Sequence, residues 1–240
     1  FEDGKITTVI GSSSSGKTLL SYILSGIIDD YTGNIISTYK NREIGYIFQR
    51  PDEAFIFETV KEELAFGIRK YNYRVDEIDK RMEEALKMVG LPKFYLDRNP
   101  FTLSSGEKEA LALATILILN PKVIIIDDPS ISLDNYRCDH LIKLLKKLCN
   151  RYKKTIIIFS SNTQFLVRVM DNYVLLKNGK IVLSGNRRNL SDNIGKFKNA
   201  NVCIPRITQF ISNANKKYNA NLEYTFDIKE LMKDIYRNVK

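Results

Sequence analysis

The stretch Gly11-Ser-Ser-Ser-Ser-Gly16-Lys17-Thr18 decides how the rest of this sequence is interpreted. It fits the pattern G-x-x-x-x-G-K-[ST] of a phosphate-binding loop. Residues 5–10 before it are rich in β-branched side chains and predict a strand, and the apolar-rich residues 19–24 after it predict a helix. A strand, a loop and a helix N-terminus in this order present free N–H groups and a positive dipole end to a phosphate. An ordinary Ser/Gly-rich turn is the less favoured alternative.

The loop itself supplies the first group of candidate site residues. We expect Lys17 to pair with the β- and γ-phosphates of a nucleotide and Thr18 to ligate Mg²⁺. The expected phosphate-binding residues are Gly11, Ser12, Ser13, Ser14, Ser15, Gly16, Lys17 and Thr18.

Composition excludes several other classes of protein. The chain has 240 residues, of which 44% are hydrophobic and 27% charged, so disorder, collagen and a coiled-coil rod are excluded. No apolar run approaches the roughly 18 residues that span a bilayer. Three scattered cysteines, Cys138, Cys149 and Cys203, predict buried thiols rather than a disulfide framework or a metal site.

The net charge of +9 is concentrated in the last part of the chain. Residues 186–240 hold 11 Lys and Arg against 5 Asp and Glu, a net of +6. Such a region can contact nucleic acid or an anionic membrane surface, but a solvated basic surface is the more economical interpretation. We therefore expect no nucleic acid partner.

Four further motifs follow the phosphate loop in order. They are Gln49 after the strand 44–48, the motif Leu103-Ser-Ser-Gly-Glu107, the strand 123–126 followed by Asp127 and Asp128, and Ser132-Leu133-Asp134. Ser104 with Glu107 in the second motif is a capping box, which predicts a helix start. The strand 123–126 is wholly apolar, as strands covered on both faces are.

This ordered set resembles the ATP-binding subunits of ABC transporters. The resemblance implies an α/β fold with a P-loop NTPase core, a helical subdomain and a small C-terminal α-rich extension. It also implies a head-to-tail dimer in which one subunit's signature motif, Ser104, Ser105, Gly106 and Glu107, and its Asp134 contact ATP held by the partner. Asp127 and Gln49 would join Thr18 around Mg²⁺, and Gln49 would also assist catalysis.

Part of the chain is similar to a narrower branch, the ATPase subunits of energy-coupling factor (ECF) transporters, which import vitamins and cobalt or nickel ions. Residues 48–67, with the phrase FQ-x-P-D followed by TV-x-E-E-L-A-F-G, carry this similarity, and residues 83–91, 204–211 and 226–232 agree with it. Ala54 departs from it, because the branch often has Gln there. The similarity implies a second ATPase subunit, a transmembrane coupling subunit, a substrate-binding membrane subunit, and a peripheral location on the cytoplasmic face of the cell membrane.

These motifs divide the chain into four predicted segments. Residues 1–50 and 109–185 form the nucleotide-binding core, residues 51–108 form the helical subdomain with the signature motif, and residues 186–240 form a docking or dimerisation extension. Within the core, residues 173–177 and 180–183 predict a hairpin with an Asn178-Gly179 turn. The family's adenine-stacking aromatic residue is expected before Phe1, so it is not named.

Three smaller interpretations concern packing. Ile78, Met82, Ala85, Leu86 and Val89 recur at helical spacing and predict a buried helix face. Two apolar stripes in the tail, at 207–214 and 228–239, predict amphipathic helices, the second capped by Asp227. Acidic residues after Gln49 form either a rim for a basic coupling helix or a solvated face. They are Asp52, Glu53, Glu58, Glu62 and Glu63.

Two residues depart from the family's catalytic pattern. Asp128 stands where the family has Glu as general base, and it is one methylene shorter. Ser161, after the strand 154–159, stands where the family has a His that contacts the γ-phosphate. His140, the chain's one histidine, is predicted on a helix as a surface or packing residue. Asp128, Gln49, Lys17 and Ser161 are therefore the expected catalytic residues, and we expect slow hydrolysis at the chain's own site.

Two alternatives to a transport ATPase stay open. The altered residues also fit a regulatory subunit of a heterodimer that binds ATP without hydrolysing it. A DNA-repair type of ABC ATPase is disfavoured, because about 85 residues separate Thr18 from Leu103 and they lack the heptads of a long coiled coil.

Overall fold

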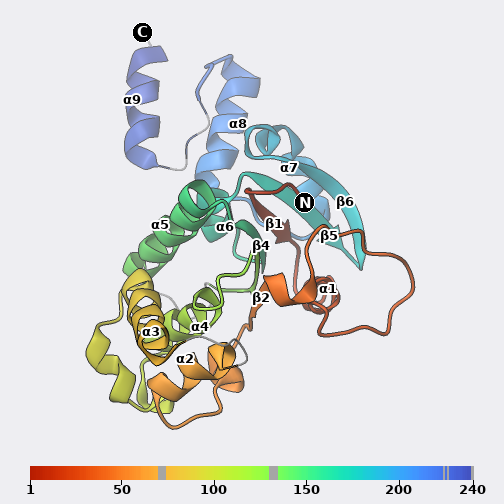
Figure 1. Ribbon diagram of the computed structural model, residues 1–240. Coiled ribbons are helices and arrows are strands. Elements are labelled where there is room, and N and C mark those ends of the chain that lie inside the picture. The colour runs from red at the N-terminus through yellow and green to blue at the C-terminus, as the bar shows by residue number, and fades with distance from the viewer. Residues whose placement is uncertain (70–73, 130–134, 224, 226, 239–240) are drawn as a thin grey trace.

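Six strands form a single sheet in the computed structural model, which describes residues 1–69, 74–129, 135–223, 225 and 227–238 (Figure 1). The strand order across the sheet is β2-β3-β4-β1-β5-β6. Every neighbouring pair is parallel except β5 and β6, which are antiparallel. The strands are β1 (Ile6–Ile10), β2 (Ile44–Ile47), β3 (Val123–Asp127), β4 (Thr155–Ser160), β5 (Asn172–Lys177) and β6 (Lys180–Asn186).

Nine α-helices lie within the described residues and surround this sheet. They are α1 (Lys17–Ser25), α2 (Val60–Ile68), α3 (Val75–Val89), α4 (Ser105–Leu117), α5 (Asn135–Tyr152), α6 (Thr163–Val169), α7 (Ile194–Asn199), α8 (Arg206–Tyr218) and α9 (Ile228–Asn238).

The three central strands, β1, β3 and β4, are buried along their whole length. Their apolar side chains alternate between two faces, as strands with both faces covered require. On one face the core includes residues of α4, α5 and α6, and on the other face α1 contacts β2, β3 and β4. The predicted α/β fold is confirmed, and the layers are visible in Figure 1.

The parallel register brings the ends of the central strands to one edge of the sheet. Ile10 lies opposite Ser160, and Asp127 lies opposite Phe159. Because parallel strands share one carboxyl edge, the loops after β1, β3 and β4 start side by side. The fold therefore gathers the predicted phosphate loop, Asp127 with Asp128, and Ser161 at this edge.

The predicted helical subdomain contains α2, α3 and the first turn of α4, and it shares one apolar core with the sheet. The predicted α3 stripe is confirmed: Met82, Ala85, Leu86 and Val89 are buried, and Ile78 is partly buried. One acidic residue was placed wrongly. Glu63 is 8% exposed, and its Oε1 accepts hydrogen bonds from the N–H groups of Ile56 and Phe57. It fixes the loop before α2 and does not belong to an acidic rim.

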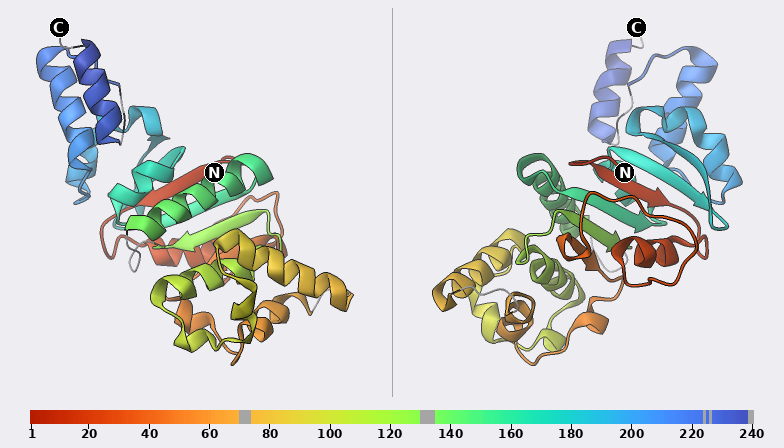
Figure 2. Two further views of the ribbon diagram at one scale, coloured as in Figure 1. Left: turned by 90° about the vertical axis from the view of Figure 1, so that its left-hand side faces the viewer. Right: turned by 45° about the vertical axis from the view of Figure 1, so that its right-hand side comes forward.

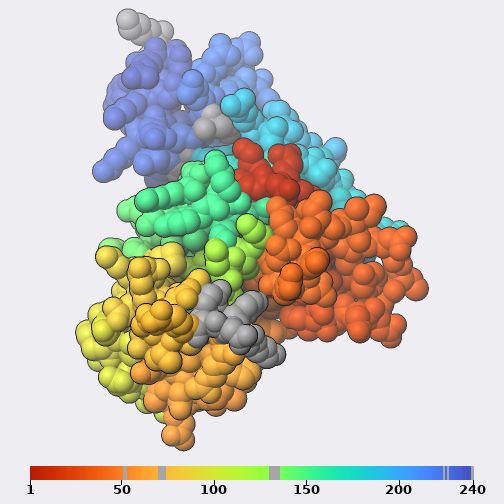
Figure 3. Space-filling model, viewed as in Figure 1, coloured from red at the N-terminus to blue at the C-terminus, as the bar shows by residue number. Residues whose placement is uncertain are grey.

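The C-terminal extension has an apolar cluster of its own. Ile211, Leu222 and Leu231 form its centre, and α8 and α9 lie side by side (Figure 2). The N–H of Lys229 donates to Asp227 Oδ1 at 2.7 Å, so the predicted Asp227 cap is confirmed. Figure 3 shows this extension and the helical subdomain at opposite ends of the molecule, with the sheet and its helices between them.

Other expectations have mixed outcomes. The β5–β6 hairpin is confirmed, and its turn residues Asn178 and Gly179 both have positive φ, at 49° and 72°. The cysteines were predicted as buried thiols, but Cys203 is exposed, Cys138 is half-buried, and Cys149 alone is buried. Within the described part of the chain, no helix has the length and apolar character needed to cross a bilayer.

Candidate functional site

The phosphate loop joins β1 to α1, and two of its residues adopt the left-handed backbone conformation. Ser14 and Gly16 have positive φ, at 61° and 97°. The side chain of Lys17 folds back across the loop, where its Nζ donates to the carbonyl oxygens of Gly11 at 3.0 Å and Ser12 at 2.9 Å. Lys17 is 9% exposed, and burial lowers the pKa of its ammonium group. A buried cation that donates to carbonyl oxygens at the start of a helix suits an anionic ligand.

The turn between β5 and β6 is hydrogen-bonded to this loop. The N–H of Gly179 donates to the carbonyl oxygen of Ser15 at 2.9 Å. A Cβ atom on Gly11 would lie 2.3 Å from Ser15 Oγ and 2.7 Å from the carbonyl oxygen of Leu176, so this position accepts glycine only. The sequence predicted the turn, but its contact with the loop joins segments too distant in sequence to be inferred.

Thr18 and Asp127 form the corner in which a metal ion was predicted. Thr18 Oγ1 donates to Asp127 Oδ2 at 2.8 Å, and Asp127 is 3% exposed. Burial raises the pKa of the Asp127 carboxyl group, and the hydrogen bond from Thr18 opposes that shift. A hydroxyl and a carboxylate are hard oxygen donors of the kind that Mg²⁺ prefers.

Tyr46 on β2 was missed by sequence reasoning. Its hydroxyl lies 2.9 Å from Ser21 Oγ and donates to Asp127 Oδ2 at 3.5 Å. Burial raises the pKa of the Tyr46 phenol, so it remains a neutral hydrogen-bond donor. Within strand 44–48 nothing distinguishes Tyr46 from a packing residue, and its role depends on the neighbouring strand β3.

Asp128 follows β3 with a positive φ of 43°. Its N–H donates to the carbonyl oxygen of Phe159 at 2.7 Å, and its Oδ1 accepts from Ser160 Oγ at 2.5 Å. Ser161, the next residue after β4, is exposed. Sequence reasoning singled out Ser161 but not Ser160, because the bond to Asp128 joins two strands. The edge thus holds two carboxylates and one ammonium group around the phosphate loop.

The signature motif forms the start of α4. Ser104 is the N-cap, and Glu107 Oε2 accepts from the N–H of Ser104 at 2.8 Å and from its Oγ at 2.6 Å. Tyr95, which was not predicted, donates its hydroxyl to Glu107 Oε1 at 2.6 Å. The bonds from the Ser104 hydroxyl, Tyr95 and the Ser104 N–H lower the pKa of Glu107 to about 2. The predicted capping box is therefore confirmed, and Ser105 lies exposed beside it.

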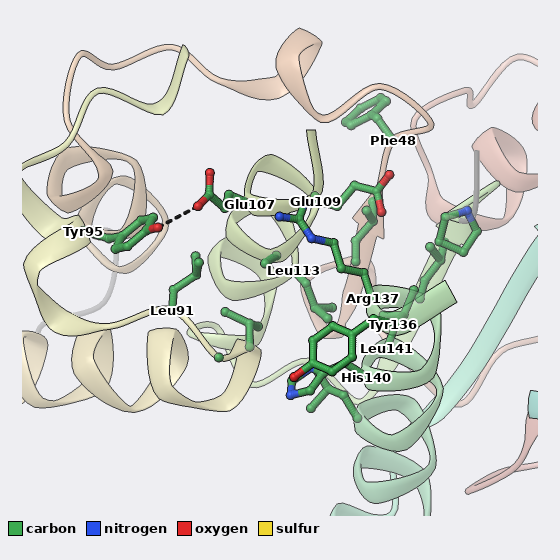
Figure 4. A pocket seen from close by; sticks show the side chains of 18 of the residues that line it. Phe48, Leu91, Tyr95, Glu107, Glu109, Leu113, Tyr136, Arg137, His140 and Leu141 are labelled. Atoms are coloured by element: carbon green, nitrogen blue, oxygen red, sulfur yellow. Dashed lines mark hydrogen bonds between the residues drawn. The ribbon is translucent and has the colours of Figure 1, made fainter. Parts of the chain in front are cut away.

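A cavity of about 320 Å³ separates the sheet from the start of α4 (Figure 4). Gln49, which is exposed, lines it together with Gly106 and Glu107. Neither Lys17 nor Thr18 lies among the residues that line it. The side chain of Arg137 packs directly against Gly106. A Cβ atom added to Gly106 would lie 1.8 Å from Nη1 of Arg137. His140 lies exposed at the cavity wall, which confirms it as a surface residue.

The predicted site residues thus form two groups within one chain. The phosphate loop, Asp127, Asp128 and Ser161 share the carboxyl edge of the sheet. Gln49, Gly106 and Glu107 line the cavity instead, and Ser104 and Ser105 precede them at the start of α4. Asp134, also predicted to contact nucleotide, lies outside the described residues.

Comparisons with known proteins identify the family and the fold of this chain. Residues 1–131 match the family model described as "ABC transporter". The chain is 30% identical, over 99% of its length, to the energy-coupling factor transporter ATP-binding protein EcfA2 of Clostridium acetobutylicum and to EcfA of Methanocaldococcus jannaschii, covering 87% and 88% of those proteins. It resembles the structure of cbiO1 from Clostridium perfringens, part of the ABC transporter complex cbiONQ, with a TM-score of 0.74, 29% identity and 88% of each chain covered. It also resembles the ATP-binding cassette MJ0796, solved as a dimer with ADP and Pi, with a TM-score of 0.67, 26% identity, and 78% of this chain and 87% of that one covered.

Proposed function

Because this chain belongs to the ABC transporter family of ATP-binding proteins, we propose that it couples ATP binding and hydrolysis to uptake of a vitamin or metal ion in an energy-coupling factor transporter. It is an ATPase of this family and binds ATP. One observation carries the proposal: Lys17, Thr18, Asp127 and Asp128 meet at one edge of the sheet, beside a helix N-terminus. The whole-chain similarity to EcfA2 and EcfA supports the ECF branch.

Lys17 binds the β- and γ-phosphates of ATP in this proposal. Its ammonium group donates to the carbonyl oxygens of Gly11 and Ser12. Phosphate oxygens replace these two acceptors, while the N–H groups of the loop and of α1 surround the β-phosphate. The residues from Ser12 to Gly16 supply that backbone, and Thr18 continues it into the helix.

The corner formed by Thr18 and Asp127 fits Mg²⁺. Both residues provide oxygen atoms. Gln49, the third proposed donor, lines the neighbouring cavity and would have to bring its amide oxygen from there to the ion. When bound, the ion neutralises charge on the phosphates of ATP. Tyr46 keeps the Asp127 carboxylate oriented by its hydrogen bond.

Hydrolysis at this site depends on Asp128 and Ser161. Asp128 takes the proton of the attacking water as general base, and the Ser161 hydroxyl donates to the γ-phosphate. Both groups are shorter than the Glu and His that they replace. Since a general base must come within about 2.6–3.2 Å of its water, and general catalysis contributes about 10²–10⁴-fold, the site turns over slowly.

A second ATPase subunit completes the site. The N-terminus of α4, with Ser104, Ser105, Gly106 and Glu107, offers N–H groups and a hydroxyl to the ATP held by the partner, and Asp134 joins them. The dimer of MJ0796 supports this arrangement. The partner is a second copy or a related ATPase, and in a mixed pair a partner with Glu and His carries most of the turnover.

Two further contacts belong to the proposal. The helical subdomain contacts the transmembrane coupling subunit through four exposed side chains, the apolar Ile56 and Phe66 and the acidic Glu53 and Glu58. The coupling subunit in turn binds the substrate-binding membrane subunit. A solvated acidic face is the alternative for the two carboxylates. The chain accordingly lies on the cytoplasmic face of the cell membrane. The segments 1–50, 51–108, 109–185 and 186–240 are proposed as its core, helical subdomain, core and docking or dimerisation extension.

Asp128 and Ser161 also favour a second candidate function. A subunit with both departures can bind ATP and regulate its partner without hydrolysing ATP itself. The two functions differ in one measurable property, the release of phosphate from the chain's own phosphate loop.

Phosphate release and MgATP binding by the full chain, beside Lys17→Ala, test the proposal. We expect tight binding with slow phosphate release, and loss of both in Lys17→Ala because the phosphates lose their cation. Tight binding without release indicates the regulatory subunit instead. Absence of MgATP binding by the wild-type chain contradicts both functions.

A further inference from the structure

Ser160 ends β4 directly beside the phosphate loop. The residue is 0% exposed, and in the parallel ladder it lies opposite Ile10, the last residue of β1. Buried hydroxyl groups in proteins are hydrogen-bonded, and the partners of this one indicate what it does.

The hydrogen bonds of Ser160 fix the direction of its proton. The N–H of Asn162 donates to Ser160 Oγ at 3.0 Å, so the serine oxygen acts there as acceptor. Its own proton then points to the other neighbour, Oδ1 of Asp128, at 2.5 Å. A hydroxyl that donates to a carboxylate makes a strong, charge-assisted hydrogen bond.

Strand β4 holds Asp128 at a second point. The N–H of Asp128 donates to the carbonyl oxygen of Phe159 at 2.7 Å, although the residue has a φ of 43°, which side-chain-bearing residues rarely adopt. Strained residues persist where neighbours over-determine them, and such residues cluster at active sites. Two adjacent residues of β4 thus determine the backbone and the carboxylate of Asp128.

The fixed carboxylate lies at the edge of the sheet that carries the phosphate loop, because the preceding residue, Asp127, accepts a hydrogen bond from Thr18 Oγ1 at 2.8 Å. Burial lowers the pKa of Lys17 in that loop, and the negative charge of Asp128 opposes this shift. Among the described residues Ser160 is the one side chain that donates to Asp128, and it engages Oδ1. No residue that the structure describes donates a hydrogen bond to Oδ2 of Asp128.

We propose that Ser160 is a positioning residue for hydrolysis, which holds the short Asp128 carboxylate so that its second oxygen reaches the attacking water. The inference rests on the proposed role of Asp128 as general base. An aspartate lacks one methylene of reach, so its orientation must be fixed by a neighbour. A glutamate at this position extends past Ser160 and depends on it less.

Steady-state phosphate release, which gives kcat and KM, and MgATP binding by the full chain test this role in the variants Ser160→Ala, Ser160→Thr, Asp128→Asn and Asp128→Glu. We expect Ser160→Ala to lower kcat about tenfold with unchanged KM and MgATP affinity, the cost of one hydrogen bond to a charged group. Ser160→Thr, which retains a hydroxyl, stays within threefold of wild type. In the Asp128→Glu background, Ser160→Ala changes kcat less than twofold.

Thr155→Val is the matched control, because it removes another buried hydroxyl from the opposite end of β4, where Thr155 Oγ1 accepts from the N–H of Gly4. It should leave kcat unchanged. If Asp128→Asn lowers kcat but Ser160→Ala does not, or if Ser160→Ala acts equally with Glu at 128, Ser160 has no positioning role. If Asp128→Asn leaves kcat unchanged, or wild type releases no phosphate, the proposed catalytic function itself fails.

Discussion

Glu107 holds the N-terminus of helix α4 in place through its carboxylate. The family often has Gln at this signature position, and Glu could equally have been a surface charge. In the structure it accepts hydrogen bonds from the backbone and hydroxyl of Ser104 and from the hydroxyl of Tyr95. All three donors favour the ionised form, and together they lower the pKa from its ordinary value of 4.5 to about 2.

This shift makes a testable statement about stability and pH. A carboxyl group whose pKa is lower in the folded state stabilises the protein above its unfolded value of 4.5, and that stability is lost as pH falls toward about 2. Glu107→Gln removes the titrating group. We therefore expect the variant to unfold at lower urea concentration than wild type at pH 6, and the difference to shrink steadily between pH 4.5 and the acid limit of folding.

Tyr95→Phe provides the control for this prediction. It removes one of the three donors and keeps the carboxylate, so its effect should follow the same pH dependence with smaller size. A difference between Glu107→Gln and wild type that stays constant from pH 6 to pH 3 would mean that the hydrogen-bonded carboxylate contributes nothing through its charge.

The elements divide into those that local sequence determines and those that tertiary contacts determine. The phosphate loop, the apolar strands and the α4 cap were predictable, because each has a short local pattern. Helices α6 and α7 were not predicted, since they are short and obtain their stability from packing. The environment of Glu63 was predicted wrongly because tertiary contacts determine it as well: its carboxylate accepts hydrogen bonds from the N–H groups of Ile56 and Phe57, and the sequence does not reveal these contacts.

The site shows the same division between local and distant information. Lys17, Thr18 and Asp127 were predictable because motifs define them. Tyr46, Tyr95 and Ser160 were not, because each acts through a residue on another element. Strand register supplies that information, and periodicity along the chain does not contain it.

Gly45 sets how closely α4 approaches the sheet. It lies in β2, and a Cβ atom there would be 2.2 Å from Ile116 Cγ2 of α4 and 3.2 Å from Pro121 Cγ. Gly45→Ala should lower the free energy of unfolding by about 1–3 kcal/mol, as overpacking does in tight cores. Urea denaturation measures the change. Adding Ile116→Ala, which removes the clashing methyl group, should recover part of the loss.

Gly195→Ala is the matched control for Gly45→Ala. Gly195 lies in α7, no atom lies within 4 Å of the position of its added Cβ, and alanine favours helices over glycine. It should be neutral or slightly stabilising. Equal destabilisation by both substitutions would show that the approach of α4 to β2 is not the limiting contact.

At the scale of the whole molecule, the helical subdomain and the C-terminal extension contact different partners in the proposed function. The helical subdomain and the C-terminal extension lie at opposite ends of the molecule (Figure 3). The extension buries Leu231 between α8 and α9, but three other apolar side chains of α9 stay exposed. They are Ile228, Met232 and Tyr236, spaced four residues apart, and they are 70%, 44% and 75% exposed.

Such spacing places Ile228, Met232 and Tyr236 on one helix face, and a contiguous exposed apolar face of this kind is typical of an interaction surface. In the proposed dimer, this face contacts the second ATPase subunit. Met232→Glu with Tyr236→Glu should therefore weaken subunit association at least tenfold in sedimentation experiments with the partner ATPase or with the chain itself. Because both side chains are exposed, the monomer should keep its melting temperature and MgATP affinity.

Lys233→Glu is the control: it changes the charge of α9 by the same total amount outside the stripe, and it should leave association unchanged. Equal weakening by the control would assign the effect to charge, and association unaffected by the stripe variant would exclude α9 from the dimer contact.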